Sequence, residues 1–272
     1  MRICAVYFSP CGNTAKVVKE AAEAFAEASG NSAVENFSIT TPEGRRKPLN
    51  FTDDDFVVIG VPTYAGRVPN KIMPFIRDEI KGNNTPAAAV VTYGNRSFDD
   101  SLIELATLMK DNGYIVTGGG AFVSEHSFAE KLATGKPDKT DCSRAAELGR
   151  SLYSKMLKKD YSEPELPGNK NFNKYYVPKG RDGKPAVFLK AKPFTDHELC
   201  TKCGNCAEVC PMGSISPEED YEVTGICIKC QACIKNCEPG AKYFTDEAFL
   251  SHRGMLEENF ADVENHSEIY IF

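Results

Sequence analysis

The feature that most constrains this chain is a dense group of cysteines near its C-terminus. Of the 11 cysteines in 272 residues, eight lie between Cys200 and Cys237, while Cys4, Cys11 and Cys142 are scattered. The run C-x2-C-x2-C-x3-C occurs twice, and a shift of 27 positions places the first run on the second. Secreted mini-proteins use such density for disulfides, but a long cysteine-poor segment precedes this group, which favours metal binding in an intracellular protein.

The cysteine spacing predicts two [4Fe–4S] clusters with exchanged ligands. Three thiolates on one tight loop face three irons of a cube, and the fourth lies too near to close the same cube, so it ligates the other cluster. Zinc is the main alternative, but zinc sites usually pair two C-x2-C knuckles or include histidine. The predicted ligand sets are Cys200, Cys203, Cys206 and Cys237 for one cluster, and Cys227, Cys230, Cys233 and Cys210 for the other.

Residues 197–241 resemble the bacterial ferredoxins that hold two clusters, and the resemblance implies a small α+β domain. Cys210 is followed by Pro211, as in that family. Cys237 is followed instead by Glu238, and proline comes one position later, so the turn there differs from the family pattern. Neither departure removes a ligand.

The N-terminal part, residues 1–158, alternates strand-like and helix-like segments. Uninterrupted apolar runs at 56–61 and 87–91 are typical of strands buried on both faces of a parallel sheet. Further strands are expected at 2–8, 34–37 and 114–116, and helices at 14–28, 70–81, 99–112 and 141–158. This alternation predicts an α/β fold with a doubly wound sheet of five parallel strands, whose ligands bind beyond the carboxyl ends of the strands.

The loop after the first strand is rich in small and hydroxyl-bearing residues. Because it leads straight into a helix, its backbone N–H groups and side chains can surround a phosphate. It contains neither G-K-S/T nor G-x-G-x-x-G, which argues against nucleoside triphosphates and dinucleotides. The candidate phosphate-binding residues are Ser9, Pro10, Cys11, Gly12, Asn13 and Thr14.

This loop resembles the phosphate loop of flavodoxins, and the resemblance implies FMN as the ligand. Flavodoxins hold the flavin ring between two further loops, with aromatic side chains stacked on it. Unless Tyr64, Tyr93 and Phe98 are only packing residues, they are the candidates for that stacking. The equivalent loop residues in this chain are Pro62, Thr63, Tyr64, Ala65 and Gly66, followed by Thr92, Tyr93, Gly94, Asn95, Arg96 and Phe98.

Several polar residues near these loops leave alternatives open. Arg67 and Arg96 either lie close to the flavin or are solvated surface residues. His126 follows the fifth strand and is either a proton donor to the flavin or a structural histidine. Tyr175 and Tyr176 are candidates for a surface that bridges or covers the site. No catalytic residue is predicted.

The whole chain resembles flavodoxin–ferredoxin fusion proteins of strict anaerobes. We expect a flavodoxin-like FMN-binding domain at 1–158, a linker at 159–196 with one short strand at 186–189, a ferredoxin domain at 197–241 and an acidic tail at 242–272. The resemblance implies FMN and two [4Fe–4S] clusters in one chain. Since flavins pass one or two electrons and each cluster passes one, the predicted function is an intramolecular relay between clusters and FMN. Such a relay carries electrons between redox partners in anaerobic metabolism.

The alternative function is an FMN-dependent reductase of a small-molecule acceptor, such as a quinone or nitro compound, fed by its own ferredoxin domain. No group of acids, histidine and lysine marks a substrate pocket, which favours the carrier. The expected partners are redox proteins or a small acceptor, and electron transfer occurs within one chain or between the chains of a homodimer.

The composition excludes other classes of partner. The net charge of −6, from 32 basic and 38 acidic residues, argues against nucleic-acid binding. No apolar run approaches the length of a membrane span, and the N-terminus lacks the pattern of a signal peptide. We therefore expect a cytoplasmic location.

Overall fold

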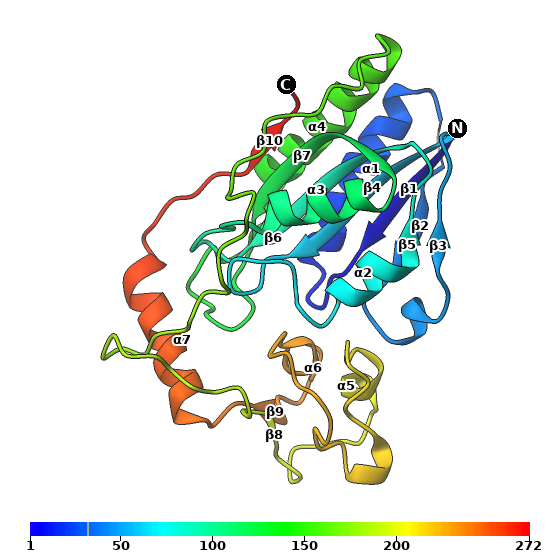
Figure 1. The fold of residues 1–272 in the computed structure, drawn as a ribbon. Coiled ribbons are helices and arrows are strands. Elements are labelled where there is room, and N and C mark those ends of the chain that lie inside the picture. The colour runs from blue at the N-terminus through cyan, green and yellow to red at the C-terminus, as the bar shows by residue number, and fades with distance from the viewer. Residues whose placement is uncertain (32) are drawn as a thin grey trace.

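The computed structural model describes residues 1–31 and 33–272, and its largest element is a parallel sheet (Figure 1). The five parallel strands are β1 (Arg2–Tyr7), β2 (Glu35–Ser38), β4 (Asp55–Pro62), β6 (Thr85–Tyr93) and β7 (Tyr114–Val123). They lie side by side in the order β7-β6-β4-β1-β2. Counted along the chain this is the order 2-1-3-4-5 of flavodoxin-like sheets, so the predicted fold class is confirmed.

A sixth strand departs from the expected five-stranded sheet. β10 (Glu268–Tyr270) comes from the C-terminal segment and pairs antiparallel with the edge strand β7, where Ile269 lies opposite Gly120. An uncovered edge strand presents unpaired backbone N–H and C=O groups. β10 supplies hydrogen-bond partners for some of these groups on β7. The segment expected as an acidic tail therefore returns to the N-terminal sheet.

Two pairs of helices cover the two faces of the sheet. α1 (Asn13–Ala28) and α4 (Lys139–Leu157) share the apolar core of one face, while α2 (Met73–Glu79) and α3 (Ser101–Asp111) share that of the other. The two helices of the first pair approach closely at Gly149, where a β carbon would stand 2.1 Å from the carbonyl oxygen of Ala21. Asp138 caps α4 by accepting the N–H groups of Thr140 and Asp141.

Short elements complete this part of the chain: η1 (Glu43–Arg45) and the parallel pair β3 (Leu49–Asn50) and β5 (Ile80–Lys81). No helix within residues 1–31 and 33–272 is both long enough and apolar enough to cross a membrane.

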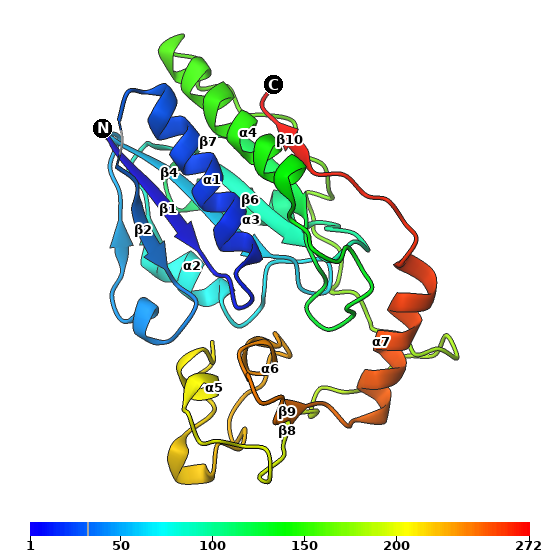
Figure 2. The ribbon, with the colours of Figure 1, turned by 180° about the vertical axis from the view of Figure 1, so that it is seen from behind.

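The cysteine repeat folds into a small module that faces the carboxyl ends of the sheet strands (Figures 1 and 2). It contains the antiparallel pair β8 (Phe194–Thr195) and β9 (Lys242–Tyr243), and the helices α5 (Asn205–Glu208), η2 (Pro217–Glu219) and α6 (Ala232–Lys235). The repeat is also visible in the backbone, because residues 27 positions apart share a positive φ. These pairs are Lys202 and Lys229, Gly204 and Gln231, and Gly213 and Gly240.

The linker forms no strand at 186–189, contrary to the expectation. Backbone pairing ends at an isolated bridge between Lys179 and Pro185 and a bond of 2.8 Å from the N–H of Ala186 to the carbonyl of Pro178. Val187 and Leu189, which follow, are 76% and 85% exposed. Phe188 instead packs its ring 5.5 Å from that of Phe249 in α7 (Glu247–Phe260). The linker therefore runs along the surface of α7, which precedes β10 (Figure 1).

Candidate functional site

The two predicted cysteine sets line two separate cavities of the small module. One cavity is lined by Cys200, Cys203, Cys206 and Cys237, and the other by Cys210, Cys227, Cys230 and Cys233. In each cavity, three cysteines come from one repeat and the fourth from the other, which is the exchange that two-cluster ligation requires. The fold thus brings each predicted set together.

The chemistry of these cysteines fits an iron–sulfur cluster. Burial raises the pKa of the Cys206, Cys227 and Cys230 thiols, so the thiolate form needs a positive partner, which iron supplies. Backbone N–H groups of Ala207 and Ala232 act against this rise in pKa, because they donate hydrogen bonds to the neighbouring sulfurs. Such N–H···S bonds stabilise cluster-bound thiolates.

A buried lysine lies between the two cysteine cavities. Lys242 is 3% exposed, and its ammonium group donates to the hydroxyl of Thr195 and the carbonyl of Tyr221, both at 2.7 Å. Its positive charge works against the rise in pKa of Cys206 in one cavity and of Cys233 in the other. Lys242 therefore places a positive charge near both predicted ligand sets.

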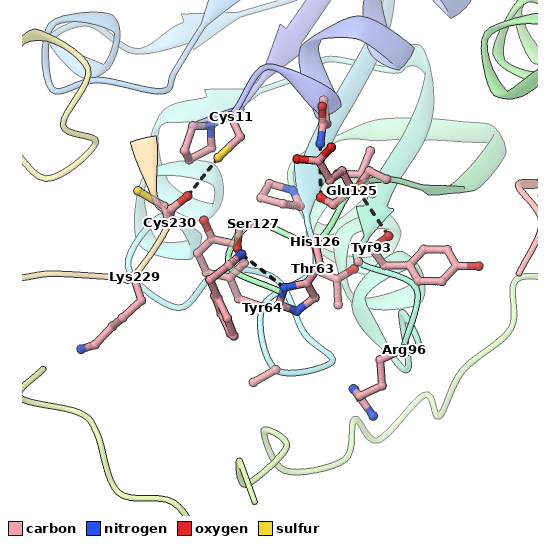
Figure 3. Close-up of a pocket in the computed structure, with 18 of the residues that line it drawn as sticks. Cys11, Thr63, Tyr64, Tyr93, Arg96, Glu125, His126, Ser127, Lys229 and Cys230 are labelled. Atoms are coloured by element: carbon pink, nitrogen blue, oxygen red, sulfur yellow. Dashed lines mark hydrogen bonds between the residues drawn. The ribbon is translucent and has the colours of Figure 1, made fainter. Parts of the chain in front are cut away.

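A third cavity, of about 260 Å³, lies where the strands of the parallel sheet end (Figure 3). Most of the residues predicted to bind a flavin line it. They are Ser9, Pro10, Cys11, Asn13, Thr14, Pro62, Thr63, Tyr64, Ala65, Gly66, Thr92, Tyr93, Gly94 and Arg96. The three loops predicted from the sequence therefore meet at one place.

The loop before α1 has the properties of an anion site. Within the described residues, the backbone N–H groups of Cys11, Asn13 and Thr14 donate to no protein acceptor, and all three residues line the cavity. The loop shape is fixed by the Ser9 hydroxyl, which accepts the N–H of Ala15 at 2.9 Å, and by Gly12 at φ 86°. Free N–H groups at the start of a 16-residue helix fit a phosphate.

The loop after β4 is a tight turn beside this anion site. Tyr64 and Arg67 exchange two backbone hydrogen bonds, of 2.9 and 3.1 Å, around Ala65 and Gly66. Both central residues have positive φ, which defines the turn type used in tight hairpins. The N–H of Thr63 donates to Thr92 at 2.7 Å, so this loop and the loop after β6 are held together.

Three predicted flavin residues do not line the cavity: Gly12, Asn95 and Phe98. The Asn95 amide turns away and donates to the carbonyls of Phe260 and Val263, at 3.0 and 2.7 Å. The rings of Phe98 and Tyr93 pack together 5.3 Å apart, and the Tyr93 ring points away from the cavity (Figure 3). Phe98 therefore lies outside the cavity, whereas Tyr93 lines it, and the stacking of either ring on a flavin stays a prediction.

The two arginines of these loops are not freely solvated. Arg67 does not line the cavity and forms a two-pronged ion pair with Glu104, at 2.7 and 2.5 Å. Arg96 lines the cavity, pairs with Asp99 and lies 4.3 Å from the centre of the Tyr176 ring. Both arginines therefore help to hold surrounding loops and the linker.

The linker covers the loops after β4 and β6. The N–H of Tyr176 donates to the carbonyl of Ala65 at 2.8 Å, and the Tyr175 hydroxyl donates to that of Val68 at 3.0 Å. Tyr176 also lines the cavity, so the interpretation of these tyrosines as a cover agrees with the structure.

His126 lines the cavity and is held as a neutral side chain. Its Nδ1 accepts the N–H groups of Ala129 and Phe128, at 3.2 and 3.4 Å, which leaves the proton on Nε2. The ring lies directly on Gly94, where a β carbon would stand 2.3 Å from Cδ2. Burial lowers the pKa of His126 to about 3, so it is a hydrogen-bond donor rather than an acid near neutral pH.

Acid is expected to destabilise the protein through His126. Because its pKa is about 3 when folded and about 6.5 when unfolded, the unfolded chain binds the proton first as the pH falls. Because of His126, we expect the free energy of unfolding to be about 1 kcal/mol lower at pH 5.5 than at pH 7.5. Unfolding midpoints at both pH values should differ less in His126→Gln than in the wild type, whereas His197→Gln, at an exposed position, should match the wild type. Equal pH dependence in all three proteins would refute this assignment.

The small module forms part of the wall of the same cavity through Ile228, Lys229 and Cys230. The thiol of Cys11 in the phosphate loop donates to the carbonyl of Cys230 at 3.0 Å (Figure 3). Two further contacts join the modules: Lys235 pairs with Glu125 at 2.6 Å, and Arg45 donates to the carbonyl of Pro211 at 2.5 Å.

Sequence reasoning missed the opposite wall of the cavity, which the linker, the loop after β7 and α7 supply. Its unpredicted members are Phe128, Pro178, Phe188, His252 and Leu256. In the sequence, only the pair of tyrosines in the linker indicated a wall on this side of the cavity. No spacing pattern connects the five residues named above.

The fold and the cysteine cavities define a class of protein. A sheet of the order 2-1-3-4-5, followed by a module with two cysteine sets, is a flavodoxin-like domain joined to a ferredoxin domain. Proteins of the ferredoxin type carry electrons to redox partners, and this chain is an iron–sulfur electron carrier of that type.

Comparison with known proteins places the C-terminal module in a family. The model of the 4Fe-4S binding domain matches residues 193–216. The pyruvate synthase subunit PorD of Methanothermobacter marburgensis is 33% identical over 57 residues, which is 21% of this chain and 69% of that protein. Ferredoxin-1 of Rhodobacter capsulatus is 36% identical over 50 residues, 15% of this chain and 77% of that protein. Through this module the chain belongs to the 4Fe-4S ferredoxin family.

The N-terminal domain has similar solved structures at low sequence identity. A flavodoxin from the domain Archaea is 16% identical, with a TM-score of 0.43, and the match covers 58% of this chain and 99% of that chain. A flavodoxin of Streptococcus pneumonia TIGR4 is also 16% identical, with a TM-score of 0.39, over 56% of this chain and 97% of that chain.

Proposed function

We propose that the chain is an internal electron relay, in which two [4Fe–4S] clusters and FMN exchange electrons on behalf of redox partners. One observation carries this proposal: residues 228–230 of the cysteine module and the three strand-end loops line a single cavity. A flavin exchanges one or two electrons and each cluster exchanges one, so a chain with both converts between the two modes.

Different residues would hold the clusters and the FMN. Each cysteine set would hold one cluster, and the free N–H groups of Cys11, Asn13 and Thr14 would hold the phosphate of FMN. The turn at Tyr64, with Gly94 and Arg96, would border the flavin ring. The proposed domains are 1–158, 159–196 and 197–241. The β8–β9 pair extends the small module on both sides of 197–241, and the chain after it returns to the first domain through β10.

The two cysteine sets would have different places in the relay. Cys230 lines the cavity assigned to FMN, together with its neighbours Ile228 and Lys229. The other set lines a cavity that shares no residue with the flavin cavity, and its Cys203 is exposed. The cluster of Cys210, Cys227, Cys230 and Cys233 would therefore adjoin the flavin, and the other would face protein partners. This arrangement needs only one chain.

Cofactor content tests the proposal. Protein purified without oxygen should contain about eight irons and one FMN per chain, because two four-iron clusters and one flavin are expected. Reduced ferredoxin should then reduce the bound flavin. A chain with about four irons, or without FMN, would contradict the relay.

One observation favours the second candidate function, a reductase of a small-molecule acceptor. The same cavity that the flavin loops line also has a wall of aromatic side chains from the linker and α7. A wall of this kind, beside the loops assigned to FMN, could hold a small planar acceptor next to the flavin.

A further inference from the structure

We propose that this aromatic part of the cavity binds a planar, uncharged carbonyl compound of the quinone type, which accepts electrons from bound FMN. The inference rests on the proposed function, because the site adjoins the loops assigned to FMN. The walls come from three segments distant in sequence: Phe128, Tyr176, Pro178, Phe188, His252 and Leu256.

The rings of this wall are arranged around His252. The Phe188 ring lies 5.5 Å from it at an interplanar angle of 28°, and the Phe128 ring lies 6.0 Å away at 52°. The Tyr176 ring is 6.3 Å from His252. Flat aromatic surfaces of this kind favour a planar ligand that stacks on them or meets them edge to face.

Two histidines supply the polar groups of the site. The Nε2 of His126 carries a proton, because Nδ1 already accepts two backbone N–H groups. The Nδ1 of His252 lies 2.8 Å from the carbonyl of Lys179 and must donate to it, which leaves Nε2 of the neutral ring as an acceptor. Neither Nε2 has a protein partner among residues 1–31 and 33–272. A carbonyl oxygen fits the donor, and the hydroxyl of a reduced product fits the acceptor.

The charged residues around the cavity are already engaged, which favours an uncharged ligand. Arg96 pairs with Asp99, and Lys229 donates to the carbonyls of Leu189 and Cys227. A carboxylate or phosphate ligand would have to displace these partners, whereas a neutral carbonyl compound needs only the histidines.

The proposed reaction is balanced by electrons from the relay and protons from water. Reduction of a quinone converts two C=O groups into two C–OH groups and consumes two electrons and two protons. Bound FMN would supply the electron pair, and the clusters held by the two cysteine sets would replace it one electron at a time.

Binding of 1,4-naphthoquinone to the oxidised holoprotein, measured by calorimetry, tests the site. Phe188→Ala should weaken this binding about tenfold, because it removes one aromatic wall. The matched control is Leu189→Ala, at the neighbouring and exposed position, which should bind as the wild type does. His252→Phe keeps the ring but removes the acceptor, so it should weaken binding of the naphthohydroquinone more than that of the quinone.

The outcomes separate this inference from the relay. Holoprotein with full iron and FMN that binds no naphthoquinone overturns the inference and leaves the relay intact. Equal binding by Phe188→Ala and Leu189→Ala also overturns it, provided that both variants retain FMN. A chain that binds no FMN overturns the relay and the inference together.

Discussion

A Cys210→Ala variant is expected to lose the cluster whose other ligands are Cys227, Cys230 and Cys233. Cys210 belongs to the first repeat, but it lines the cavity of the second set. Iron should fall from about eight to about four atoms per chain, because one cluster of two is lost. FMN should still bind, but reduced ferredoxin should no longer reduce it rapidly, because the lost cluster is the one proposed to adjoin the flavin.

Cys142→Ala is the matched control for this variant. Cys142 lies in α4, outside both cysteine cavities, and the substitution should leave iron, flavin and electron transfer unchanged. The prediction fails if Cys210→Ala keeps all its iron, or if it loses iron while the flavin is reduced at the wild-type rate.

An Arg67→Met variant is expected to be less stable by about 3–5 kcal/mol, because it leaves a buried charge without its partner. Glu104 is 2% exposed and accepts from Arg67 and from the N–H of Val68 at 2.8 Å. Arg67 also donates to the carbonyl of Asn173 and lies 5.0 Å from the Phe172 ring, so the linker should loosen as well. Denaturant unfolding, with FMN release recorded in the same titration, measures both effects.

The matched control is Arg77→Met. Arg77 pairs with Asp78 on the surface, where both side chains are more than half exposed, so no measurable loss is expected. In the double variant Arg67→Met/Glu104→Leu, much of the lost stability should return, since no unpaired charge remains. Equal stability of Arg67→Met and Arg77→Met would show that the buried pair contributes nothing.

Local patterns were sufficient to predict most of the sheet and which cysteines line the same cavity of the small module. The apolar run at 56–61 lies within β4, and the run at 87–91 within β6, because a strand buried on both faces must be apolar throughout. The C-x2-C-x2-C-x3-C spacing likewise determines how the cysteines are divided between two clusters, because a tight loop can offer only three thiolates to one cube. Such features depend on neighbours in sequence.

Contacts between distant segments were not predictable in this way. The bond between Cys11 and Cys230 joins residues 219 positions apart, and neither residue carries a signal for the other. β10 is only three residues long, and its pairing depends on an edge that the rest of the fold creates. The Asn95 side chain points away from the cavity, because its amide donates to two carbonyls at and just after the end of α7.

The arrangement of the flavin loops shows the same limit. Tyr93 and Phe98 were natural candidates for stacking on a flavin, but they pack on each other. Besides Tyr64 and Tyr93, the aromatic residues that line the cavity include Phe128 and Phe188, which come from outside the predicted loops. Strand ends could be located from the sequence, whereas the directions of side chains on the loops depend on what packs against them.

The concentration dependence of flavin reduction tests the central claim, that clusters and flavin exchange electrons within one chain. Holoprotein is mixed without oxygen with a limiting amount of reduced ferredoxin, and visible absorbance follows the transfer from the clusters to the flavin. If one chain holds the whole relay, this phase has a rate constant that does not change with chain concentration. A rate that rises in proportion to chain concentration, or clusters that stay reduced beside an oxidised flavin, would contradict the account.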